Sequence, residues 1–161
     1  MKVSGSISKA PNKQRTKKVA SPVLDLGLLE HSVGYALRMA SFHATQRFHK
    51  VMRSFQLRPA QFSTLVLIGA NPGVRQRDLC ETLRIEKANF VGLLDILERR
   101  NLVERRSEPN DRRRHAIFLT KEGESLLRKA SHTHAGMENR LKKQLSIGNK
   151  PDFLMTLARL R

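Results

Sequence analysis

Apolar residues recur every three or four positions over residues 28–55, which predicts one long amphipathic helix. A second helix is expected from Pro59, a residue favoured in the first turn of helices, until the breaker Asn-Pro-Gly at 71–73. Thr120 has the side chain of an N-cap for a further long helix, and a last helix is expected to begin around Pro151. Long helices are therefore predicted to flank a different central region.

That central region carries two short helical patterns, over residues 75–83 and 87–100, followed by strand formers at 102–106 and 116–119. A turn is predicted at 107–111, with an arginine cluster exposed beside it. The expected fold is mainly α with a small β-hairpin wing, an α+β arrangement. It is a winged helix-turn-helix flanked by long helices, and it suits duplex DNA.

Small and polar side chains on the exposed first turns of the second helix are what base edges in a major groove can accept. An Arg-tipped hairpin can reach phosphates or a narrow minor groove, although an isolated cluster could equally be a solvated turn. The residues expected to contact DNA are Arg75, Gln76, Lys87, Ala88, Asn89, Gly92, Asp111, Arg112, Arg113 and Arg114.

Residues 97–105, 109–114 and 118–123 resemble the multiple antibiotic resistance regulator (MarR) family of winged-helix transcription factors. In the wing signature of that family, an Asp and the Arg two positions on precede a Leu-Thr pair. The residues that match it here are Asp111, Arg113, Leu119 and Thr120. The family usually has Gly where this chain has Asn101, and Asn tolerates the left-handed backbone that the position needs.

The chain carries 31 Lys and Arg against 14 Asp and Glu, a formal net charge of +17, which indicates a polyanionic partner such as double-stranded DNA. Residues 1–20 hold six of these cations and no acid, and segment 1–22 is expected to be a disordered basic tail that serves solubility or extra phosphate contact. Residues 23–161 are then one domain. Its DNA-binding module is expected at 56–120.

The helices at 28–55 and 121–161 carry apolar stripes that a small central module could not cover. Association of two chains would bury these stripes. The resemblance implies that the same elements form a homodimer interface, which lets two recognition helices reach half-sites one turn apart.

No catalytic constellation is recognisable: the chain lacks a Gly-rich phosphate loop, zinc-type Cys/His spacing and a nucleophile motif. We therefore expect no enzyme activity, no cofactor and no metal site. The single cysteine, Cys80, fits a reducing cytoplasm and is expected to be buried and inert. No apolar run has the ~20 residues of a membrane span, so no membrane partner is expected.

The resemblance also implies a small aromatic or otherwise anionic effector, bound between the dimerisation helices and the winged module. Aromatic and cationic side chains on the first two helices suit such a ligand, although each could instead be a core or solvated residue. The residues expected at this site are Tyr35, Arg38, Phe42, His43, Arg47, Phe62 and Val66. Residues 58–73 resemble regulators of aromatic-acid degradation, some of which respond to aryl-coenzyme A thioesters.

The sequence therefore predicts a homodimeric transcriptional repressor that binds a pseudo-palindromic operator and is released by a small effector. The alternative is a non-specific, nucleoid-type DNA-binding protein, for which the charge and the tail would suffice.

Overall fold

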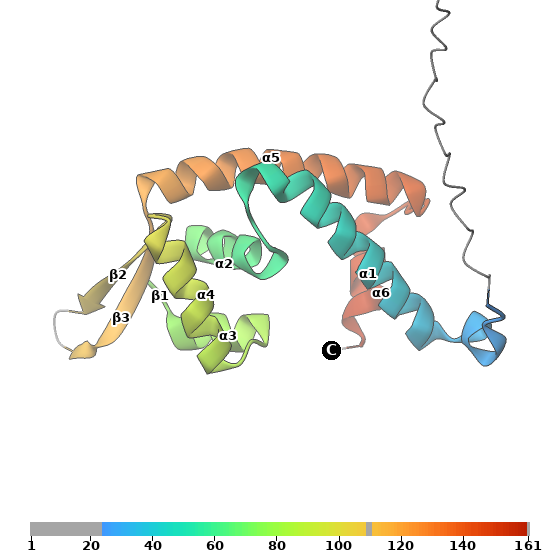
Figure 1. Cartoon of the computed structure of the whole chain (residues 1–161), viewed down its shortest axis with the longest axis horizontal. Coiled ribbons are helices and arrows are strands. Elements are labelled where there is room, and N and C mark those ends of the chain that lie inside the picture. Colours follow the sequence, from blue (N-terminus) through green and yellow to red (C-terminus); the bar gives the residue numbers. More distant parts are fainter. Residues whose placement is uncertain (1–23, 109–110, 161) are drawn as a thin grey trace, which may run out of the picture.

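The computed structural model describes residues 24–108 and 111–160. Helix α5 lies along one edge of the molecule, with α2 beneath it, α3, α4 and the sheet at one end, and α1 and α6 at the other (Figure 1). The elements are, in chain order, η1 (Gly27–His31), α1 (Val33–Met52), η2 (Arg53–Phe55), α2 (Pro59–Ala70), β1 (Val74–Arg75), α3 (Gln76–Leu83), α4 (Lys87–Arg99), β2 (Val103–Glu108), β3 (Asp111–Leu119), α5 (Lys121–Gln144) and α6 (Lys150–Ala158). A mainly helical winged helix-turn-helix with long flanking helices is confirmed.

The single helix predicted over residues 28–55 is wrong at both ends. Ser32 has an extended backbone (φ −85°, ψ 115°), and its Oγ accepts a hydrogen bond from the Tyr35 amide at 3.2 Å, so it caps a new helix, α1, after the short η1. Beyond α1 the chain tightens into the 3₁₀ turn η2, which ends at Gln56 with a positive φ of 52°. Ser32 is an N-cap residue within the apolar repeat, and a prediction from the spacing of apolar residues alone does not detect it.

The sheet has strand order β1-β3-β2, and both pairs are antiparallel. The hairpin ladder extends beyond the predicted strands, through Ser107 opposite His115 to Glu108 opposite Asp111. Residues 112–114 therefore lie in β3, and the prediction that the second strand begins only at residue 116 was wrong. Backbone pairing does not require apolar side chains, so a hydropathy pattern ends too early in a charged hairpin. Strand β1 was not predicted, because two residues are too few to show alternation.

The start of α5 is fixed against the turn between α4 and β2. Asn101 has the left-handed backbone expected of it, with φ 55°. The Thr120 hydroxyl donates to the Asn101 carbonyl at 2.6 Å and accepts from the Gly123 amide at 3.0 Å, which confirms the predicted N-cap. A Cβ at Gly123 would run into the Leu102 carbonyl, so this position leaves no room for a side chain.

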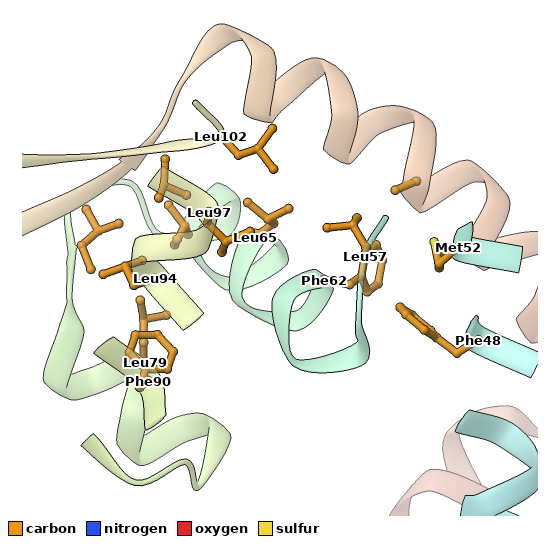
Figure 2. Packing of buried hydrophobic residues seen from close by; sticks show 14 of the residues in the cluster. Phe48, Met52, Leu57, Phe62, Leu65, Leu79, Phe90, Leu94, Leu97 and Leu102 are labelled. Carbon is orange, nitrogen blue, oxygen red and sulfur yellow. The ribbon is translucent and has the colours of Figure 1, made fainter. Parts of the chain in front are cut away.

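The hydrophobic core runs from the helix-turn-helix to the end of α1. Phe90, Leu94 and Leu97 of α4 are fully buried and cluster with Leu79 of α3 and Leu65 of α2 (Figure 2). The cluster continues through residues of α1 and α2. Helices α3 and α4 therefore share one hydrophobic core with the flanking helices.

Large apolar side chains remain exposed on η1, the start of α1 and α6. Leu28 is 92% exposed, Val33 is 74% exposed, and α6 has no buried residue. None of the helices in the described part of the chain combines the length and hydrophobicity that a membrane span requires.

Candidate nucleic-acid interface

The first turns of α4 present the residues that were expected to face base edges. Lys87, Ala88, Asn89 and Gly92 are all exposed, and a Cβ added at Gly92 would meet nothing within 4 Å. Val91 follows the apolar spacing of this helix, which predicts a place on its inner face, but the structure leaves it 38% exposed. Most exposed side chains on the first turns of α4 are thus small or polar, and such side chains fit against base edges in a major groove.

The two remaining helix-turn-helix candidates lie at the start of α3. Arg75 is exposed in β1, and Gln76, the first residue of α3, is half-buried. One turn further, Arg77 Nε donates to Glu81 Oε1 at 2.7 Å, and this hydrogen bond raises the pKa of the Arg77 guanidinium. The Glu81 carboxylate thereby offsets the positive charge of Arg77.

The wing is joined to the recognition helix by an ion-pair network that sequence reasoning missed. Arg105 of β2 donates from Nη1 to Glu98 Oε2 and from Nη2 to Asp95 Oδ1, both at 2.6 Å. Its side chain is only 24% exposed. Asp95 and Glu98 are three residues apart, hence on one face of α4, and that spacing was the signal available in the sequence.

The four wing residues expected at DNA are the ones on which the structure says least. Asp111, Arg112, Arg113 and Arg114 belong to β3 by their backbone, and their side chains lie outside the described residues. The expected basic tail, 1–22, also lies outside the described residues.

A second cation, Arg100, ties the end of α4 to the end of the α1 segment. Its Nη1 donates to the Gln56 carbonyl at 2.9 Å and its Nη2 to the Phe55 carbonyl at 2.8 Å. Both carbonyls belong to a helix end, where such groups lack helical partners. No sequence pattern indicates this bond, which joins positions 44 and 45 residues apart.

The residues expected at the effector site separate into three groups. His43 and Arg47 line a cavity of about 690 Å³ between α1 and the α5–α6 end, together with Leu37, Leu141 and Phe153. Tyr35, Arg38 and Phe42 lie on α1 outside that lining, and Phe42 contacts His43 edge to face at 5.5 Å.

Phe62 and Val66 line a different cavity, of about 430 Å³. The His134 ring of α5 lies tilted by 33° against the Phe62 ring, with centroids 4.8 Å apart, and the Phe48 ring lies 5.7 Å from Phe62. Neither Phe48 nor His134 was among the expected effector residues, because only the fold brings α1, α2 and α5 together here.

Cys80 is partly buried, and burial raises the pKa of its thiol, which keeps it protonated and unreactive near neutral pH. Within the described ranges, no three His, Cys, Asp or Glu side chains gather in a way that could hold a metal ion.

Comparison with known proteins identifies relatives that share this architecture. Residues 55–114, which span the helix-turn-helix and the first part of the wing, match the model of the MarR family. The chain is 32% identical over 130 residues to the transcriptional regulator HosA of Escherichia coli O111:H-, an alignment that covers 77% of this chain and 96% of that one.

Two solved structures of the transcriptional repressor CouR have similar folds. The structure bound to a 23-mer DNA duplex has a TM-score of 0.82 and 39% sequence identity, and covers 86% of this chain and 99% of that chain. The structure bound to p-coumaroyl-CoA has a TM-score of 0.78 and 37% identity, and covers 86% and 97%.

Proposed function

Because this chain belongs to the MarR family of transcriptional regulators, we propose that it is a homodimeric repressor that binds a pseudo-palindromic operator and is released by a small effector. The observation that carries the proposal is the exposed first turns of α4, together with the wing that Arg105 fixes to the second half of the same helix. A helix end and a hairpin in fixed relation can enter neighbouring grooves of one duplex.

In this proposal the first turns of α4 enter the major groove. Asn89 can pair with an adenine through two hydrogen bonds, and Lys87 can neutralise a phosphate. Ala88 and Gly92 are small, so they let the helix lie close to the bases. Arg75 and Gln76, at the start of α3, contact the DNA backbone. In the wing, Arg113 enters the minor groove with Asp111 as its orienting carboxylate, flanked by Arg112 and Arg114.

A homodimer would cover the apolar surface of η1, the start of α1 and α6. Side chains such as Leu28, Val33 and Leu154 are 92%, 74% and 51% exposed in the single chain. Two chains joined through these elements can place their α4 helices at half-sites about 34 Å apart, one turn of duplex.

We propose that the effector is an aromatic acid or its coenzyme A thioester. The CouR repressor, 37% identical, was solved with p-coumaroyl-CoA. For the aromatic part, the cavity lined by Phe62 and His134 is the stronger candidate in this chain, since aromatic side chains in its wall suit contact with an aromatic ligand. His43 and Arg47 line the α1–α6 cavity instead, next to the apolar surface that a partner chain would cover.

Operator specificity tests the proposal. A duplex selected from a random pool should bind the protein in a fluorescence-anisotropy titration, and excess random DNA should leave most of that binding intact. A nucleoid-type protein, which the net charge of +17 would also suit, should lose the duplex to random competitor. Light scattering should give the mass of two chains.

Release can be assigned to a cavity with two filling variants. Ser63→Phe fills the Phe62–His134 cavity, and Ser41→Phe fills the α1–α6 cavity. We expect the Ser63 variant to keep operator affinity and lose release by candidate aromatic acids and their coenzyme A esters. The Ser41 variant should still respond.

A further inference from the structure

The two faces of the wing sheet have different neighbours. Successive strand residues point to opposite faces, so Arg105 turns toward α4 while Arg106 turns away from it. The Arg106 guanidinium lies over the Phe118 ring, 4.3 Å from its centroid, and pairs with Glu104 on the same face. An aromatic ring and a cation thus lie together on the side of the wing that faces away from the recognition helix.

A cavity of about 740 Å³ opens beside this face, between the end of α2 and the first half of α5. Its walls are mainly apolar and include Val66, Pro72, Phe118 and Leu127. Cavities of roughly 300–1,000 Å³ with apolar walls and a few polar groups are typical of small-molecule sites. We call it the wing-root cavity.

One cation at the wing-root cavity, Arg128, is available to an anion. The carboxylate of Glu124 and the hydroxyl of Ser131 also line the cavity, and the second lining arginine, Arg106, is already paired with Glu104. Arg128 is exposed and forms no ion pair or side-chain hydrogen bond with the other described residues. An unpaired guanidinium beside an apolar wall is suited to two parallel hydrogen bonds with a carboxylate.

We propose that the wing-root cavity is a binding site for a small aromatic carboxylate, with Arg128 pairing the carboxylate and Phe118 and Leu127 contacting the ring. It is distinct from the Phe62–His134 cavity, since the two share only Val66 among their lining residues. The basic segment at residues 1–20 is a poor occupant, because its six cations would meet two arginines. The site does not depend on the proposed repressor function.

The probe for this site is 2-naphthoate, whose intrinsic fluorescence reports binding to the full chain. Arg128→Gln should weaken its affinity by about 10- to 100-fold, the effect of losing one charge-assisted hydrogen-bonded pair. Ala70→Trp, at an exposed lining residue where α2 ends, should abolish binding by filling the cavity. Arg140→Gln removes the same charge from the same helix outside the cavity lining and should change nothing.

The outcomes separate this site from the effector cavity of the proposed repressor. Loss of binding in Ser63→Phe with full binding in Ala70→Trp would overturn the wing-root proposal and leave the repressor function standing. Equal affinity for uncharged 2-naphthalenemethanol, or no saturable binding to the unmodified chain, would also overturn it. Melting temperatures establish that each variant is folded. If Ala70→Trp does not fold, the comparison of 2-naphthoate affinity between Arg128→Gln and Arg140→Gln decides whether the site exists.

Discussion

Replacing Arg105 with Met should loosen the wing from the recognition helix. The change removes two charge-assisted hydrogen bonds, each 2.6 Å long, to Asp95 and Glu98. Such bonds are worth roughly 1.5–3 kcal/mol each when well shielded from water. The two carboxylates are 38% and 40% exposed, so water can replace part of what is lost, and we expect a total loss of about 1.5–3 kcal/mol.

For a domain of this size each kcal/mol moves the melting temperature by roughly 2–4 °C, so Arg105→Met should lower it by about 3–12 °C. Urea denaturation should give the same loss of unfolding free energy with an unchanged slope. Operator affinity should also fall, because a wing that is no longer fixed to α4 must be ordered when it binds.

Arg106→Met is the matched control, since it removes the same charge from the next residue on the opposite face. The Arg106 side chain is 60% exposed, and its ring contact is worth only about 0.5–1 kcal/mol at such a site. A double-mutant cycle with Asp95→Asn should give a coupling energy for Arg105 and none for Arg106. Equal losses in the two methionine variants would refute the assignment of Arg105 as the link between wing and helix.

Gly123→Ala should lower the unfolding free energy by about 1–3 kcal/mol, because the new methyl runs into the Leu102 carbonyl. Gly92→Ala, in open space on α4, should raise the unfolding free energy by about 0.5–1 kcal/mol. A lower unfolding free energy in both variants would contradict the steric explanation. Asn89→Ala should relax base preference at one position of each half-site, as measured by binding to single-substituted operators, whereas uniform weakening would make Asn89 a phosphate contact. Arg113→Ala should weaken operator binding by about 1–3 kcal/mol while light scattering still gives a dimer; unchanged affinity would exclude the wing from recognition. Because burial raises the pKa of the Cys80 thiol, its contribution to stability is complete below the unfolded pKa, near 9.0, and is lost as pH rises through the folded pKa. Cys80→Ala should therefore flatten the alkaline side of the stability profile, and an unchanged profile would contradict this account.

Local signals in the sequence predicted much of the fold. The cap at Thr120, the left-handed turn at Asn101 and the apolar spacing of α4 each act over a few residues, and each was found. The break at Ser32 was missed because the apolar repeat runs through it, although its hydroxyl caps α1.

Tertiary contacts could not be predicted in the same way. The His134 ring of α5 contacts the Phe62 ring of α2, and Arg100 donates a hydrogen bond to the Gln56 carbonyl. No periodicity in the sequence predicts either contact. The exposed face of α4 followed from helix geometry alone. The expected effector residues rest on chemical type, and all of them, including Tyr35, Arg38 and Phe42, remain predictions.

The bond from Arg100 to the end of the α1 segment has a mechanical consequence. It anchors one end of α4, while Lys87 and Asn89, proposed to read the bases, lie at the other end of a 13-residue helix. That helix is about 20 Å long, so a tilt of ~5° about the anchor sweeps its far end by roughly 1.7 Å. A hydrogen bond tolerates much less than that. The helix acts as a lever whose pivot lies on the flanking helices, so small rotations of α1 are magnified where the bases are read.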